Sequence, residues 1–153
     1  MIANVSIDSS LFLNLDMKNN IDLVRWAENA YTTQWGYVPH TDGNVLTEEK
    51  YKALKEKYPK DIKEECDKWQ SRRTTDNYNL LRSYLWYDSK SRTISKDNYS
   101  ISDMSVQELY NFASVKGSMD KLPERLGTAV ISGDIIGIYI GGGNVVYAKS
   151  VTD

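Results

Sequence analysis

The residue types along this chain change abruptly at Gly127. Before this glycine, apolar residues recur at helical spacing in several segments, and after it β-branched residues predominate in short runs. We predict strands at 128–131, 135–140 and 144–149. The three glycines at 141–143 can supply the positive φ that a tight turn needs, so the last two strands are predicted to form an antiparallel hairpin. This order of elements predicts an α+β fold in which N-terminal helices pack on a C-terminal antiparallel sheet.

Five segments before Gly127 carry helical patterns with recognisable ends. Thr47 and Ser105 have hydroxyl groups that can cap a first turn, and Ser105 forms a capping-box pattern with Glu108. Pro59 stops the second helix, because the residue before a proline is pushed out of the helical region. The first helix is predicted to turn Leu23, Val24, Trp26, Ala27, Ala30 and Tyr31 towards the core. The first predicted helix begins at Asn20. The next three run over 47–58, 60–70 and 77–86, and the last begins at Ser105 and ends at Gly117.

Length and composition predict one domain that covers residues 1–153. A chain of 153 residues with 41% hydrophobic and 26% charged residues can bury a core of its own, and it contains no repeat or linker that would divide it. Residues 1–18 have no firm pattern and are predicted to be an extended arm with room for one short strand. Residues 89–103 are predicted to be a polar loop.

Charge and rare residues exclude several classes of function. The net charge of -2 gives no basic excess for nucleic-acid binding, and one cysteine and one histidine exclude disulfides and multi-ligand zinc sites. We therefore predict no metal and no cofactor. No apolar run approaches the roughly 20 residues of a membrane span. The apolar patch at 11–13 lacks a basic segment before it, so we predict no signal peptide and a protein that is cytoplasmic or released by phage lysis.

Several stretches share their order and spacing with one family. Residues 36–43 (GYVPHTDG) form a turn-rich segment, and residues 76–86 open an amphipathic helix. The later pieces are the KG and LPE text within 116–124, DIIGIYIG at 134–141 and NVVYA at 144–148. Together these segments resemble the NlpC/P60 cysteine peptidases, which are bacterial and phage hydrolases of peptidoglycan peptides. The resemblance covers the chain from about residue 20 onward and implies a papain-like fold. Family members continue for one or two strands beyond the equivalent of Asp153, so it also implies that C-terminal strands are missing here.

The departures from this family fall at its reactive positions. The family cysteine aligns with Asn77, the glycine two residues later with Asn79, and the family histidine with Ile135. The polar residue that orients the histidine lies near Tyr147, and the glycine after the tyrosine-bearing turn aligns with His40. A cysteine peptidase needs a thiolate and a base within hydrogen-bond reach, and neither asparagine nor isoleucine supplies them. The resemblance therefore implies a degenerate member without peptidase activity.

Polar and aromatic residues remain around the implied cleft. Tyr37, Tyr78 and Tyr147 are predicted to converge there with Asp76 and Asn77, and a tyrosine-lined groove can hold a peptide or a glycan. For Asp76, a role as helix N-cap is favoured over a role in the site. We therefore predict a pseudoenzyme whose former active-site cleft binds a peptidoglycan stem peptide or a protein partner at the bacterial cell wall.

Two other functions stay open on the sequence alone. One is an active peptidoglycan hydrolase with a rearranged site that uses Cys66, or His40 with Asp42. Cys66 is more typical of a buried core residue, and a lone imidazole without a nucleophile performs no reaction. The other is a structural, immunity or phage-associated interaction protein.

Overall fold

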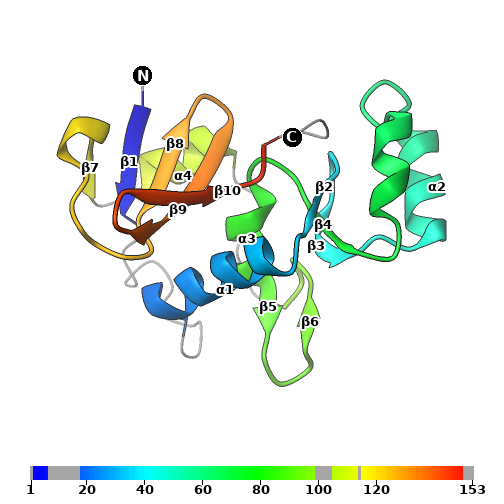
Figure 1. Cartoon of the computed structure of the whole chain (residues 1–153), viewed down its shortest axis with the longest axis horizontal. Helices are drawn as coiled ribbons and strands as arrows, with labels where there is room; N and C mark the ends of the chain where they lie inside the picture. Colours follow the sequence, from blue (N-terminus) through cyan, green and yellow to red (C-terminus); the bar gives the residue numbers. More distant parts are fainter. Residues whose placement is uncertain (1, 7–17, 99–104, 114, 150–153) are drawn as a thin grey trace.

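The computed structural model describes residues 2–6, 18–98, 105–113 and 115–149. A five-stranded antiparallel sheet with helices packed beside it forms the larger part, and a three-stranded sheet with α2 forms the smaller part (Figure 1). The α+β class predicted from the order of segments is therefore confirmed. The described helices include none that is both long and apolar enough to cross a lipid bilayer.

The last two strands form the predicted hairpin, and the strand before them pairs beside it. The strands β9 and β10 pair antiparallel, and the connecting glycines at 141–143 have φ values of 96°, 59° and 77°. Glycine adopts these left-handed values without the steric cost that a Cβ atom would impose. The strand β8 pairs with β9 on its other side. The bounds are Ala129–Ser132 for β8, Ile135–Gly141 for β9 and Asn144–Tyr147 for β10.

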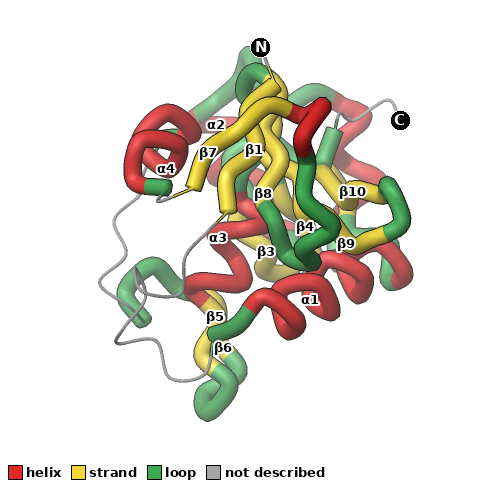
Figure 2. The backbone as a smooth tube through the Cα atoms, turned by 90° about the vertical axis from the view of Figure 1, so that its left-hand side faces the viewer, coloured by secondary structure: helices red, strands yellow, loops and turns green. Residues whose placement is uncertain are grey.

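The sheet also contains a strand from the N-terminal arm. The strand β1 (Ile2–Ser6) lies between β8 and β7 (Val115–Ser118), which gives the order β10-β9-β8-β1-β7. Figure 2 shows β7, β1 and β8 side by side. The sequence allowed for one strand in the arm but did not indicate its place in the middle of the sheet. Residues 7–17 of the arm lie outside the described residues.

Helices α1 (Asn20–Thr32) and α3 (Asn79–Trp86) pack together against the sheet. The predicted inward face of α1 is buried at four positions, and Trp26 is half-buried and donates its indole N–H to Ser83 Oγ at 3.0 Å. The prediction for Tyr31 is wrong, since it lies in the last turn of α1 and is 74% exposed. The core shared by α1, α3 and the sheet includes Leu23, Ala27, Ala30, Leu80, Leu81, Leu85, Ala129, Ile136 and Ile138.

The smaller part has a separate core beneath α2 (Glu48–Lys57). Thr47 caps this helix, as predicted, by accepting the backbone N–H of Lys50 at 3.2 Å. The helix predicted over 60–70 is instead a short 3₁₀ helix, η2 (Glu64–Trp69), because the chain turns after Pro59 and becomes helical only after Lys63. The strands are β2 (Gly36–Tyr37), β3 (Asp42–Val45) and β4 (Arg73–Thr75), and the core is Val38, Leu46, Tyr51, Ile62 and Cys66.

The remaining segments complete the larger part. The predicted polar loop contains a small hairpin of β5 (Tyr87–Asp88) and β6 (Thr93–Ile94), and residues 99–104 lie outside the described part. The capping box of α4 (Val106–Phe112) is confirmed. The predicted end of this helix at Gly117 is wrong, because Gly117 lies in β7 opposite Asn4. A 3₁₀ turn, η3 (Met119–Lys121), follows β7.

Candidate functional site

The start of α3 is held by the carboxylate of Asp76. Asp76 Oδ1 accepts the backbone N–H groups of Tyr78 and Asn79 at 3.3 and 3.0 Å. The helix begins at Asn79, two residues later than the sequence indicates, and its N-cap position is Tyr78. Asp76 lies before that position, but it still accepts backbone N–H groups at the start of the helix. Burial raises the pKa of the Asp76 carboxyl above its ordinary value of 3.8, while the two N–H groups and the Arg82 charge act in the opposite direction. Only 6% of Asp76 is exposed.

Asp76 is the first member of a buried polar chain that follows one face of α3. Asn79 Nδ2 donates to Asp76 Oδ2 and to the backbone carbonyl of Thr41, each at 3.0 Å. Arg82 Nη1 donates to Asn79 Oδ1 at 3.2 Å. The amide side chain of Asn79 therefore bridges Asp76, Arg82 and the turn that contains Thr41. The network fixes Asp76, Asn79 and Arg82 in single orientations and joins α3 to the turn between β2 and β3.

Sequence reasoning missed the roles of Asn79 and Arg82. Asn79 was considered only as the replacement for a glycine, and Arg82 was not considered at all. Asp76, Asn79 and Arg82 are spaced three residues apart, and side chains at this spacing meet along one helix face. This spacing of charged and amide groups was the available signal.

Asn77 lies directly beside the start of β9. Its backbone carbonyl accepts the N–H of Ile136 at 3.0 Å. Its side chain is half-buried, and Asn77 Oδ1 is buried with no hydrogen-bond partner among the described residues. Ile135 precedes Ile136 at the start of β9, so Asn77 and Ile135 come to neighbouring places in the fold. An amide and an aliphatic side chain cannot act there as a nucleophile and a base.

The structure separates the three tyrosines that were predicted to converge. Tyr37 pairs with Thr75, the neighbour of Asp76, and Tyr78 donates its backbone N–H to Asp76 Oδ1. Burial, and then the charges of Asp76 and Tyr78, raise the pKa of Tyr37. Tyr147 pairs with Gly137 across β10 and β9. It lines a separate hollow of about 230 Å³ with Tyr31 and other residues.

A polar cleft of about 450 Å³ opens at the start of α3, and we call it the α3 cleft. The guanidinium of Arg82 lies 5.2 Å from the ring centre of Tyr78 and 5.9 Å from that of Trp86. Arg82 is only 7% exposed, so its charge is held between aromatic rings at the wall of the cleft. The residues that line the α3 cleft are His40, Asp42, Tyr58, Asp76, Tyr78, Asn79, Arg82, Trp86 and residues 94–97.

His40 and Cys66 do not form a rearranged pair. His40 Nε2 lies 2.8 Å from Asp61 Oδ2, not beside Asp42, and the imidazole stacks on Tyr58 with ring centres 3.8 Å apart. His40 has a φ of 64°, in the left-handed region that few residues other than glycine adopt. Cys66 is completely buried, and burial raises the pKa of its thiol.

The described residues contain no group of three or more histidine, cysteine, aspartate or glutamate side chains that could hold a metal ion. The site therefore consists of carboxylate, amide, guanidinium and aromatic groups, which can bind a polar ligand by hydrogen bonds and stacking. No family model, curated protein or solved structure matches the chain.

Proposed function

We propose that this chain is a catalytically silent relative of the NlpC/P60 peptidases that binds a peptidoglycan stem peptide in the α3 cleft. The hydrogen bond from Ile136 N–H to the Asn77 carbonyl is the observation that carries the proposal. It joins Asn77, where the NlpC/P60 resemblance would place the thiol, to the residue that follows Ile135, where the resemblance would place the imidazole. With Asn77 and Ile135 there, the reacting groups are absent while the frame around them is kept.

The α3 cleft supports binding because its polar groups are already ordered. Asp76, Asn79 and Arg82 are joined by hydrogen bonds of 3.0 and 3.2 Å, so little side-chain entropy is lost when a ligand binds. A volume of about 450 Å³ is within the range of small-ligand sites. A stem peptide offers amide groups and carboxylates, which are the partners that such a wall can recognise.

A rearranged hydrolase has less support. An activated thiol needs a semi-exposed, electropositive setting, whereas Cys66 lies in the small core with a raised pKa. His40 contacts Asp61 and Tyr58 and has no thiol beside it.

The proposal is tested with muropeptides released from peptidoglycan by a muramidase. We expect titration of the ¹⁵N-labelled protein to shift backbone amide signals of residues 76–82, and we expect no new free amines after long incubation. Tyr78→Ala is expected to weaken binding about tenfold through the lost stacking surface. Tyr31→Ala is the matched control, because Tyr31 is 74% exposed and lies outside the α3 cleft.

Three outcomes would overturn the proposal. Release of new amines would show that the domain is an enzyme. Amide shifts confined to the hollow around Tyr147, with Tyr78→Ala unchanged, would move the ligand to the other hollow. Absence of muropeptide binding, together with recovery of a specific protein partner, would favour the interaction-protein alternative.

A further inference from the structure

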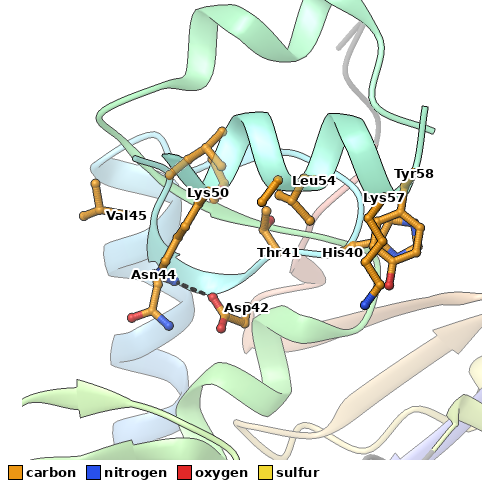
Figure 3. Close-up of a pocket in the computed structure, with 12 residues that line it drawn as sticks. His40, Thr41, Asp42, Asn44, Val45, Lys50, Leu54, Lys57 and Tyr58 are labelled. Atoms are coloured by element: carbon orange, nitrogen blue, oxygen red, sulfur yellow. Dashed lines mark hydrogen bonds between the residues drawn. The ribbon is translucent and has the colours of Figure 1, made fainter. Parts of the chain in front are cut away.

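A second hollow of about 330 Å³ lies between β3 and α2, and we call it the α2 hollow (Figure 3). It adjoins the α3 cleft, since His40, Asp42 and Tyr58 line both. Its walls are largely apolar. Val45 and Leu54 contribute to them, and Val45 is 42% exposed although it is a large aliphatic residue.

The base of the α2 hollow contains an unpartnered hydroxyl. Thr74 lines the hollow from β4 and is completely buried, and its Oγ1 has no hydrogen-bond partner among the described residues. Successive side chains of a strand point to opposite faces. Thr75 accordingly lines the hollow of Tyr147, and Thr74 faces α2. A buried hydroxyl without a partner lowers stability, so this base is suited to an occupant that brings a polar atom as well as apolar surface.

Two lysines of α2 give the rim of this hollow a positive charge. Lys50 and Lys57 line it from the same helix, seven residues apart, and so lie about 10 Å apart along the helix axis. Neither forms an ion pair with a described residue, whereas Lys52 pairs with Glu48 on the same helix. Asp42 is the one carboxylate among the lining residues, and its Oδ1 already accepts the backbone N–H of Asn44.

We infer that the α2 hollow is a second binding site, which takes an extended peptide with one apolar side chain between two acidic residues. The apolar side chain would fill the space beside Leu54, and the carboxylates would approach Lys50 and Lys57. Residues i, i+2 and i+4 of an extended peptide share one face, so an apolar side chain and a carboxylate on either side of it can all point into the hollow. The two acidic residues are then separated by roughly 13 Å, which the long, flexible side chains of two lysines about 10 Å apart along α2 can span. This inference goes beyond the proposed function, because it does not depend on a ligand in the α3 cleft.

The probe is the peptide acetyl-Glu-Ala-Leu-Ala-Glu-amide, titrated into the ¹⁵N-labelled protein. We expect amide shifts in β3 and around Leu54, and a Kd that rises with salt because exposed charges are screened. The matched peptides acetyl-Gln-Ala-Leu-Ala-Gln-amide and acetyl-Glu-Ala-Ser-Ala-Glu-amide remove the charge and the apolar side chain in turn. Each is expected to bind at least fivefold more weakly.

Charge reversal at the rim tests the site in the protein. The double variant Lys50→Glu with Lys57→Glu is expected to weaken binding of the probe at least tenfold. Lys55→Glu with Lys60→Glu changes the net charge equally, and neither residue lines the hollow. Equal loss in both double variants, equal binding of the three peptides, or no shifts in β3 and α2 would overturn the inference.

The two sites can fail separately. Tyr78→Ala is expected to leave binding of the probe peptide unchanged, and Lys50→Glu with Lys57→Glu is expected to leave muropeptide binding unchanged. Probe-induced shifts confined to residues 76–82 would assign the peptide to the α3 cleft and end the case for a second site.

Discussion

Helix α3 has a partly or fully buried charge at each end, and the two charges are held differently. At the N-terminal end, Asp76 accepts backbone N–H groups and also the side chain of Asn79, which in turn holds Arg82. At the C-terminal end, Lys18 Nζ donates to the carbonyls of Tyr84 and Tyr87 at 2.7 and 2.5 Å. Both signs of charge are those that the helix dipole favours.

The difference lies in what depends on each charge. Removal of Asp76 would leave several buried donors without an acceptor and would leave Arg82 without its nearby negative charge. Removal of Lys18 would leave the carbonyl groups of Tyr84 and Tyr87 without this donor. Because Lys18 is only half-buried, water can approach the position it leaves. The N-terminal end of α3 is therefore a connected site, whereas the C-terminal end is a local anchor.

The largest effect is expected from Asp76→Ala. Loss of a helix cap and of an acceptor for buried donors should lower the free energy of unfolding by about 3 kcal/mol, measured by urea denaturation. Asp88→Ala is the control, because Asp88 is only partly buried and also accepts two backbone N–H groups, and the loss of stability should be much smaller. Similar losses in the two variants would show that the buried network adds nothing to an ordinary cap.

A smaller effect is expected from Lys18→Met. Methionine keeps the apolar stem but removes the ammonium group, whose contacts with the carbonyls are offset by the cost of its burial. The free energy of unfolding at pH 7 should change by less than about 1 kcal/mol, in the same denaturation assay. A loss as large as that of Asp76→Ala would make the two ends of α3 equivalent.

The pH dependence of stability should distinguish the two ends by sign. Burial lowers the pKa of Lys18 from 10.5 to about 8, so its contribution to stability is present above pH 10.5 and is lost as pH falls through about 8. The raised pKa of Asp76 acts in the opposite sense, since its contribution is present below pH 3.8 and is lost as pH rises through its folded value. Unfolding curves should show each slope in the wild type and not in Lys18→Met or Asp76→Asn. Persistence of a slope in the matching variant would assign it to another group.

The smallest effect on stability is expected from Asn77→Cys, since Asn77 Oδ1 has no described partner to lose. The change in the free energy of unfolding should stay below about 1 kcal/mol. The thiol reactivity is the sharper readout. Asn77→Cys with Ile135→His should react with iodoacetamide at pH 6 about tenfold faster than Asn77→Cys alone, because an adjacent imidazole lowers a thiol pKa. Equal rates would show that the side chains at positions 77 and 135 do not interact, and would remove the main support for the proposed function.

Local signals predicted the parts of the fold that depend on neighbouring residues. The Thr47 cap, the capping box at Ser105 and the hairpin at 141–143 are all confirmed, because each is determined within a few residues. The end of α4 was wrong because Gly117 pairs with Asn4, which is distant in sequence. No local pattern could show that pairing.

The candidate site was predictable only in part, for the same reason. Asp76 was expected to cap α3 from its place before an apolar helix face, and it accepts backbone N–H groups there, although the N-cap position is Tyr78. The bond from Asn79 to the Thr41 carbonyl joins two segments whose approach depends on the whole fold. Tyr147 was expected beside Tyr78, but the register of β10 against β9 directs it into another hollow.

The position of β1 has a consequence for how this protein is made. Val5 pairs with both Lys116 and Ala129, so β1 cannot join the sheet until those partners have been synthesised. During synthesis on the ribosome, β1 therefore remains unpaired until most of the chain has been made. Contacts of such long sequence separation slow folding and leave strand edges open to association with other chains. Until Ala129 has been synthesised, β1 in a nascent chain is therefore exposed to such association.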